Sequence, residues 1–131
     1  YKISPFTGTD DIVFRVEFSV KKENEAKRSE IAEKASGYMK QRVDKGHFKF
    51  PCAGSVFKNN RDFGAPSGQI IDEAGLKGYS IGDAQIEPWQ GNIIINTGKA
   101  GSKDVKALVD YIKAQIKEEK GFELEEEIIF K

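Results

Sequence analysis

The clearest alternation of apolar and polar residues lies in the segment "DIVFRVEFSV", from Asp11 to Val20. Apolar residues occupy every second position, and Arg15, Glu17 and Ser19 lie between them. Successive side chains of a β-strand point to opposite faces of its sheet, so this pattern predicts a half-buried strand.

Helical periodicity marks three other stretches of the chain. From Glu23 to about Asp44 the composition changes to Ala, Glu, Lys, Arg and Met, which predicts one long amphipathic helix. A short helix is expected from about Ser67, ending at Gly75 or Gly78, because Gly commonly terminates helices. Ser102 is the expected N-cap of a last helix that ends at Gly121. Its apolar stripe consists of Val105, Leu108, Val109, Ile112 and Ile116.

Strand-like runs occupy much of the remaining sequence. "YSIGDAQIE" and "NIIINTG" are separated by "PWQG", which reads as a turn, and the chain closes with "FELEEEIIF", a predicted final strand. Adjacent strands are too close for parallel crossover connections. The pattern therefore predicts an α+β fold, with an antiparallel or mixed sheet covered by helices, in a single domain over residues 1–131.

Composition narrows the classes of partner. Lys plus Arg equals Asp plus Glu, at 21 each, so no overall charge attracts the chain to nucleic acid or to an anionic membrane. No apolar run approaches the roughly 20 residues that span a bilayer. Cys52 is the only cysteine and His47 the only histidine, so we expect neither an internal disulfide nor a typical zinc site. A cytoplasmic location is consistent with this cysteine content.

The chain has neither a glycine-rich dinucleotide fingerprint nor a P-loop lysine motif. Ser55, in "PCAGSVFKN", follows a Gly after a Pro, which is most often a turn that leads into a strand. No general base lies near it in sequence, although a serine that only donates a proton needs none. Glu127 is either one of several solvated glutamates or a half-buried functional carboxylate. Lys45, Lys49, Lys58, Asn59 and Gln90 surround turns, where ligand contacts tend to occur, but are ordinary surface residues when taken singly.

Taken in order, "AGSVFKN", "GQIIDEAGLKG", "IGDAQIEPWQGNIIIN" and "GFELEEEI" resemble the C-terminal part of UDP-N-acetylenolpyruvoylglucosamine reductase (MurB). "YKISPF" resembles the segment that ends the flavin-binding part of that family. The resemblance implies the substrate-binding domain of a bacterial cytoplasmic enzyme of peptidoglycan synthesis. That enzyme uses NADPH and FAD to reduce UDP-N-acetylglucosamine enolpyruvate to UDP-N-acetylmuramate.

The resemblance also assigns roles to single residues. It implies that Ser55 protonates C2 of the enolpyruvyl group after hydride has reached C3. Glu127 falls on the family's glutamate, which would stabilise the carboxylate of the intermediate, and such preorganised donors contribute strongly to catalysis. Lys45, Asn59 and Gln90 would hold the UDP-sugar.

The chain departs from the family pattern at several positions. Lys2 stands where the family has a catalytic arginine, and its ammonium cannot form a bidentate fork on a carboxylate. Asp83 replaces a usual glycine and Asn60 a usual proline, which should alter local loops more than chemistry. The short stretch from Val20 to Glu23 leaves no room for an extra substrate-covering loop, so the chain resembles the shorter, type II-like form.

The FAD-binding domain of the family would precede Tyr1, so we expect the chain to be the C-terminal domain of a longer enzyme and to be inactive alone. Two other readings stay open. One is a stand-alone module that binds a nucleotide sugar without catalysis, which the substitution at Lys2 favours. The other is a structural α+β domain whose similarity to the family is only architectural.

Overall fold

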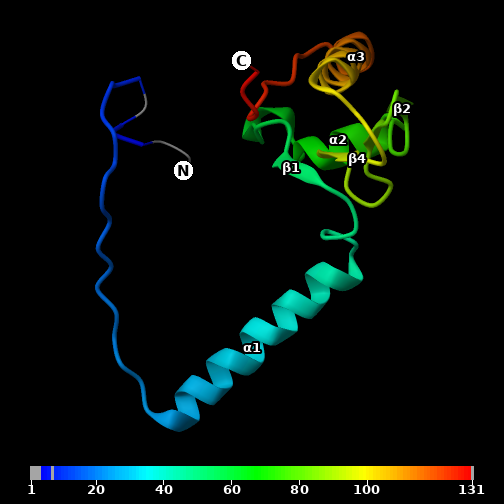
Figure 1. Ribbon diagram of the computed structural model, residues 1–131. Coiled ribbons are helices and arrows are strands. Elements are labelled where there is room, and N and C mark those ends of the chain that lie inside the picture. Colours follow the sequence, from blue (N-terminus) through cyan, green and yellow to red (C-terminus); the bar gives the residue numbers. More distant parts are fainter. Residues whose placement is uncertain (1–3, 7, 131) are drawn as a thin grey trace. The chain divides into compact units, whose positions relative to one another are not determined.

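The computed structural model describes residues 4–6 and 8–130 and divides the chain into two compact units, Tyr1–Ala35 and Ser36–Lys131 (Figure 1). Among the described residues, no helix combines the length and the apolar character needed to cross a bilayer.

The first unit contains an extended segment and the beginning of helix α1. The predicted strand at residues 11–20 is absent, since these residues are extended but pair with no other strand. Its apolar side chains are exposed, with Ile12 at 90% and Phe14 at 96%. An isolated strand cannot satisfy its backbone or bury its apolar face, and the described part of this unit offers no second strand. Arg15 and Glu17, which share a face in an extended chain, form an ion pair of 2.6 Å.

Helix α1, Glu25–Asp44, confirms the predicted long helix. The side chain of Asn24 accepts a hydrogen bond of 2.9 Å from the Lys27 N–H, which caps the first turn. No residue of α1 is buried. Its apolar residues, among them Ile31, Tyr38 and Met39, are more than half exposed.

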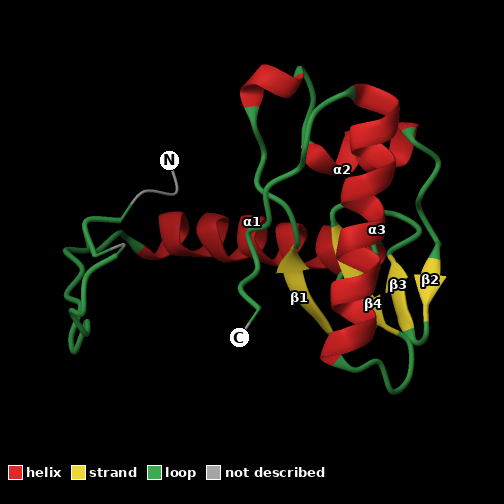
Figure 2. Ribbon diagram, turned by 90° about the horizontal axis from the view of Figure 1, so that it is seen from above, coloured by secondary structure: helices red, strands yellow, loops and turns green. Residues whose placement is uncertain are grey.

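The second unit is built on a four-stranded antiparallel sheet with the order β1-β4-β3-β2 (Figure 2). The strands are β1 (Cys52–Ser55), β2 (Ser80–Ile81), β3 (Ala84–Ile86) and β4 (Ile93–Asn96). The predicted single run "YSIGDAQIE" is therefore a tight hairpin, because Gly82, with a φ of 56°, reverses the chain between β2 and β3. The sheet confirms the predicted α+β class.

Two helices and a 3-10 turn complete this unit: η1 (Arg61–Phe63), α2 (Ser67–Glu73) and α3 (Ser102–Lys120). Helix α3 begins one residue earlier than predicted, because Gly101 and not Ser102 is its N-cap. Its end at Gly121, which has a φ of 77°, confirms the prediction.

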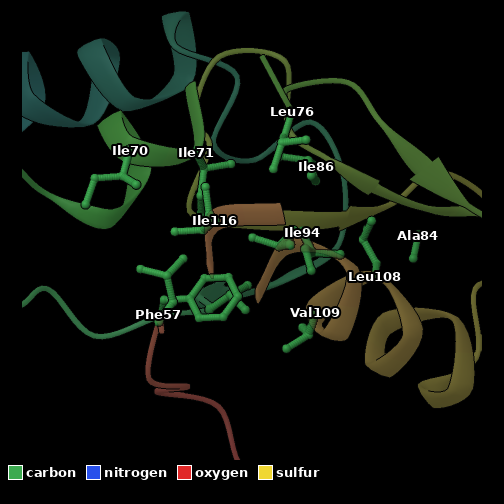
Figure 3. Close-up of a cluster of buried hydrophobic side chains, with 13 residues drawn as sticks. Phe57, Ile70, Ile71, Leu76, Ala84, Ile86, Ile94, Leu108, Val109 and Ile116 are labelled. Carbon is green, nitrogen blue, oxygen red and sulfur yellow. The ribbon is translucent and has the colours of Figure 1, made fainter. Parts of the chain in front are cut away.

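The core lies between α3 and one face of the sheet, with α2 and the segment after β1 at its edge (Figures 2 and 3). Four of the five residues predicted to form the apolar stripe of α3 are fully buried, and Val105 is partly buried. The cluster comprises Val56, Phe57, Ile70, Ile71, Leu76, Ala84, Ile86, Ile94, Leu108, Val109, Ile112, Ile116 and Leu124.

The predicted final strand is wrong except for one bridge, which pairs Phe57 with Glu126. Leu124 is buried as expected, and the Lys58 N–H donates to the carbonyl oxygen of Glu125 at 2.8 Å. The C-terminal segment thus follows the residues after β1, but β1 ends at Ser55 and offers no regular ladder beyond it.

Candidate functional site

A β-bulge at the end of β1 positions Ser55. Cys52 pairs with Ile95 and Ser55 with Ile93, so three steps along β1 match only two along β4. The extra residue is accommodated at Gly54, whose φ of 83° suits glycine. Bulges bend a strand and redirect its side chains, and they occur often beside functional sites. Ser55 is exposed, whereas the next two residues, Val56 and Phe57, are buried.

Asn92 continues this pairing past the end of β1. Its backbone carbonyl accepts from the Val56 N–H at 2.9 Å. Its side-chain oxygen accepts from the Phe57 N–H, and its amide nitrogen donates to the Phe57 carbonyl, both at 2.8 Å. The side chain therefore substitutes for a strand partner and fixes the residues that follow Ser55. Asn92 is only 6% exposed, so these bonds form away from solvent.

The start of α2 holds the next two residues of the loop. The Ser67 hydroxyl donates to the carbonyl oxygen of Lys58 at 2.7 Å, and the Ser67 N–H donates to Oδ1 of Asn59 at 3.0 Å. Ser67 is fully buried. The carbonyl end of the Asn59 amide is therefore used within the protein.

A cleft of about 360 Å³ lies over these elements. It brings together three of the predicted site residues, Ser55, Asn59 and Gln90. The rest of its lining consists of Pro66, Gly68, Gln69, Asp72, Trp89, Gly91 and Asn92. Hydroxyl and amide groups predominate, so the cleft suits a ligand that is rich in hydrogen-bonding groups.

Two glycines allow two walls of this cleft, helix α2 and the turn at residues 88–92, to pack closely. A Cβ at Gly68 would lie 2.3 Å from Oε1 of Gln90, and one at Gly91 would lie 2.5 Å from the Gly68 carbonyl oxygen. Helix α2 and the turn at residues 88–92 can therefore approach closely only because both positions lack a side chain.

Glu127 lies beside Ser55 along the backbone, since its N–H donates to the Val56 carbonyl at 2.7 Å. Its side chain is half-buried. The residues that line the cleft do not include Glu127. The structure thus brings Ser55 and Glu127 to neighbouring backbone positions without placing both side chains in one described cleft.

Lys45 lies in a second cleft of about 390 Å³, which also contains Lys49, Phe48 and Trp89. Trp89 lines both clefts and is 58% exposed. Lys2, the remaining predicted site residue, lies outside the described residues.

A buried carboxyl, Glu87, lies two residues before Trp89. It is 2% exposed, and its Oε2 has no hydrogen-bond partner among the residues that the structure describes. Burial raises the pKa of Glu87 above its ordinary value, and the nearby His47 acts in the opposite direction.

Lysines relieve the repulsion expected among the C-terminal glutamates. Lys113 donates to Glu126 at 3.0 Å and lies 3.3 Å from Glu123, and Lys58 pairs with Glu125. Burial acts to raise the pKa of Glu126, but the hydrogen bond from Lys113 leaves it below its ordinary value. The hydrogen bond from Lys117 is the largest cause of the lowered pKa of Glu123. Lys113 and Lys117 thus attach the C-terminal segment to α3, and Lys58 attaches it to the residues that follow β1.

The two unusual loop residues noted in the sequence have local roles. Oδ2 of Asp83 accepts from the Lys99 N–H at 2.7 Å, which ties the β2–β3 turn to the loop before α3. Oδ1 of Asn60 accepts from the Asp62 N–H at 3.0 Å and caps η1.

Sequence reasoning missed Asn92, Ser67, Glu87 and Trp89. Trp89 carried a usable signal, because it is the only tryptophan and lies in a predicted turn. The other three depend on contacts between distant segments, so the sequence offered no local sign of them.

Comparison with known proteins identifies the family. Residues 45–131 match the family described as "UDP-N-acetylenolpyruvoylglucosamine reductase, C-terminal domain". The chain belongs to this family. UDP-N-acetylenolpyruvoylglucosamine reductase of Borreliella burgdorferi is 44% identical over 130 residues, which cover 99% of this chain and 42% of that protein. The reductase of Treponema denticola is 44% identical over 139 residues, with the same coverage of each chain.

The chain spans about two fifths of the length of these curated relatives. Among solved structures, the MurB of Thermus caldophilus is similar with a TM-score of 0.48 and 42% identity. That match covers 66% of this chain and 32% of the other.

Proposed function

We propose that this chain is the substrate-binding part of a UDP-N-acetylmuramate dehydrogenase. That enzyme reduces UDP-N-acetylglucosamine enolpyruvate to UDP-N-acetylmuramate during peptidoglycan synthesis in the bacterial cytoplasm. The observation that supports this most is the cleft in which Ser55, Asn59 and Gln90 meet. These residues come from two separate segments, "AGSVFKN" and "IGDAQIEPWQGNIIIN", and each segment is a motif of the family.

Asn59 and Gln90 hold the sugar portion of the substrate. The Asn59 carbonyl oxygen is bonded to Ser67, so its NH₂ group is the part that can donate to a ligand. Gln90 presents an amide to the same cleft. Lys45, in the adjoining cleft, supplies a point charge for the pyrophosphate.

Ser55 donates the proton of the reaction. Reduction of the enolpyruvyl double bond adds a hydride to one carbon and a proton to its neighbour. The exposed hydroxyl of Ser55 is held rigidly between the bulge at Gly54 and the buried Val56. Such positioning favours proton transfer to a substrate carbon over transfer from mobile water.

Glu127 is held next to this serine by the hydrogen bond from its N–H to the Val56 carbonyl, and it helps to stabilise the carboxylate of the intermediate. Lys2 provides the positive charge that the family's arginine supplies, as one ammonium in place of a bidentate fork.

In our proposal the enzyme uses FAD and NADPH, and FAD is bound mainly by the N-terminal domain of the family, outside this chain. A flavin ring needs a largely apolar slot, whereas the cleft at Ser55 is lined mainly by polar side chains. The residues of this cleft therefore do not by themselves form a slot for the flavin. We further propose that residues 1–131 form a single substrate-binding domain, that its residues 1–10 correspond to the end of the flavin-binding part, and that the chain alone is inactive.

The serine assignment is tested by Ser55→Ala in a full-length reductase that carries this domain. General acid catalysis is worth roughly 10²- to 10⁴-fold, so reduction of the enolpyruvyl substrate should slow by about that factor. Reduction of the flavin by NADPH should keep its rate, because Ser55 takes no part in it. Stopped-flow absorbance of the flavin measures both half-reactions.

Ser80→Ala is the matched control, since Ser80 is an exposed serine on β2 that does not line the cleft. A wild-type rate of substrate reduction in Ser55→Ala would remove the serine from the mechanism.

A further inference from the structure

The two clefts described above meet at one side chain, Trp89, which lines both. The cleft at Ser55, at about 360 Å³, lies near the lower end of the roughly 300–1,000 Å³ range of ligand pockets. A nucleotide sugar is elongated, so a molecule with its reacting end at Ser55 would extend past Trp89 into the second cleft.

Charge determines which part of such a ligand lies in each cleft. Among the residues that the structure describes, Asp72 is the only charged one that lines the cleft at Ser55, and an acidic side chain repels phosphate. The second cleft contains two basic residues, Lys45 and Lys49, and one acidic residue, Asp44, so its lining carries a net positive charge. The diphosphate of a nucleotide sugar is therefore favoured in the second cleft.

Aromatic surface accompanies these lysines. Trp89 is 58% exposed and Phe48, in the same cleft, is 57% exposed. The Lys49 ammonium lies 5.5 Å from the centroid of the Trp89 ring. The loop at Gly46 also lies close to the indole of Trp89, since a Cβ built on Gly46 would be 3.6 Å from the Cε3 atom of Trp89. An exposed aromatic ring beside a cation is the combination that proteins use to bind a base and its phosphates together.

We propose that Trp89 is the stacking platform for the nucleobase of the nucleotide sugar, with Lys45 and Lys49 on its diphosphate. This inference rests on the proposed function and adds a residue that positions the end of the ligand opposite to Ser55. The sugar and enolpyruvyl group occupy the cleft lined by Asn59 and Gln90. The base lies across the indole, and its phosphates meet the two lysines.

Because Trp89 is the only tryptophan, the indole fluorescence of the chain shows directly whether a ligand binds at this ring. The whole chain is titrated with UDP while indole fluorescence is followed. Proton NMR of the uracil H5 and H6 signals is recorded in parallel, because stacking on an indole moves them upfield. We expect saturable quenching together with an upfield shift of both signals. N-acetylglucosamine 1-phosphate lacks the base, so the chemical shifts of its sugar-ring protons should not change when the chain is added.

Substitutions assign the effect to the ring. Trp89→Ala should weaken UDP binding, measured by calorimetry, by about tenfold or more and remove the uracil shift, because a stacked base contributes that much on alanine substitution. Trp89→Tyr should restore most of the affinity and the shift. Tyr38→Ala is the matched control, since Tyr38 is 65% exposed and lines neither cleft.

The outcomes separate this inference from the proposed function. If UDP-N-acetylglucosamine enolpyruvate binds with equal affinity to wild type and Trp89→Ala, and no uracil shift occurs, the stacking role is wrong while substrate binding stands. If the sugar protons of N-acetylglucosamine 1-phosphate shift upfield in place of the uracil signals, Trp89 binds the sugar and the base assignment is wrong. If neither UDP nor the complete UDP-sugar binds the chain, both proposals fail.

Discussion

At the scale of single residues, the buried carboxyl of Glu87 gives the second unit a measurable dependence on pH. Its raised pKa, caused by burial, means that the folded state binds this proton more tightly than the unfolded state. The resulting stabilisation is fully present below the ordinary glutamate pKa of 4.5 and is lost as pH rises through the higher folded value. The nearby His47 acts to lower the pKa of Glu87 and so makes this loss smaller.

We predict that Glu87→Gln, which keeps the shape but cannot ionise, removes this dependence. The free energy of unfolding of the variant, relative to wild type, should rise as pH increases from about 4.5 to 8, because only the wild type must then bury a charge. Urea unfolding at a series of pH values measures the difference. Taking the difference between the two proteins cancels the titration of Glu123 and Glu126, whose lowered pKa values act with the opposite sign. A difference that stays constant with pH would contradict the prediction.

The site residues that sequence reasoning placed correctly in one cleft, Ser55, Asn59 and Gln90, all lie in motifs recognised from the family. Glu87 and Asn92 were missed because their roles depend on burial by distant segments. A polar residue that ends up buried looks the same in sequence as one that remains in solvent. Catalysis by Ser55 and Glu127 remains a prediction, and Lys2 lies outside the described residues.

At the scale of elements, two glycines of similar surroundings have opposite roles. A Cβ at Gly54 or at Gly37 would meet nothing within 4 Å, so neither position is closed by packing. Gly54 has a φ of 83° in the bulge of β1, whereas Gly37 lies inside α1. Replacing each glycine by alanine therefore differs only in the backbone conformation that the alanine must adopt.

We predict that Gly54→Ala lowers the free energy of unfolding by about 1–2 kcal/mol, because the left-handed conformation is strained for alanine. It should also weaken ligand binding at the cleft, since relief of that strain would move Ser55. Gly37→Ala should instead stabilise α1 by up to about 1 kcal/mol, as alanine is the better helix former. Far-UV circular dichroism reports on α1, and Trp89 fluorescence reports on the sheet. Equal effects of the two substitutions would contradict the role of the bulge.

The sequence predicted elements best where one segment contains its own signal. The helices α1 and α3 were found because helical periodicity and glycine at the C-terminus are local features. The expected strands at residues 11–20 and at the C-terminus were wrong because a strand exists only through a partner. The alternation of residues 11–20 predicts a face to be buried, but no periodicity shows what covers it.

At the scale of the whole molecule, the α+β class followed from the order of elements, and the family match supports it over residues 45–131. The pairing order β1-β4-β3-β2 could not be deduced, because it brings β1 next to a strand that follows it by some 40 residues. This long-range pairing places Ser55 and Asn92 together and thereby forms the cleft. The central claim is that this cleft binds the enolpyruvyl UDP-sugar.

The most direct test is an NMR titration of the 131-residue chain with UDP-N-acetylglucosamine enolpyruvate, followed through backbone amide shifts. The account predicts saturable changes that are largest at Ser55, Asn59 and Gln90 and at the indole N–H of Trp89. Amides on the exposed face of α3, such as those of Lys106 and Asp110, should not move. An absence of saturable change at millimolar ligand, or changes confined to residues away from the cleft, would contradict it.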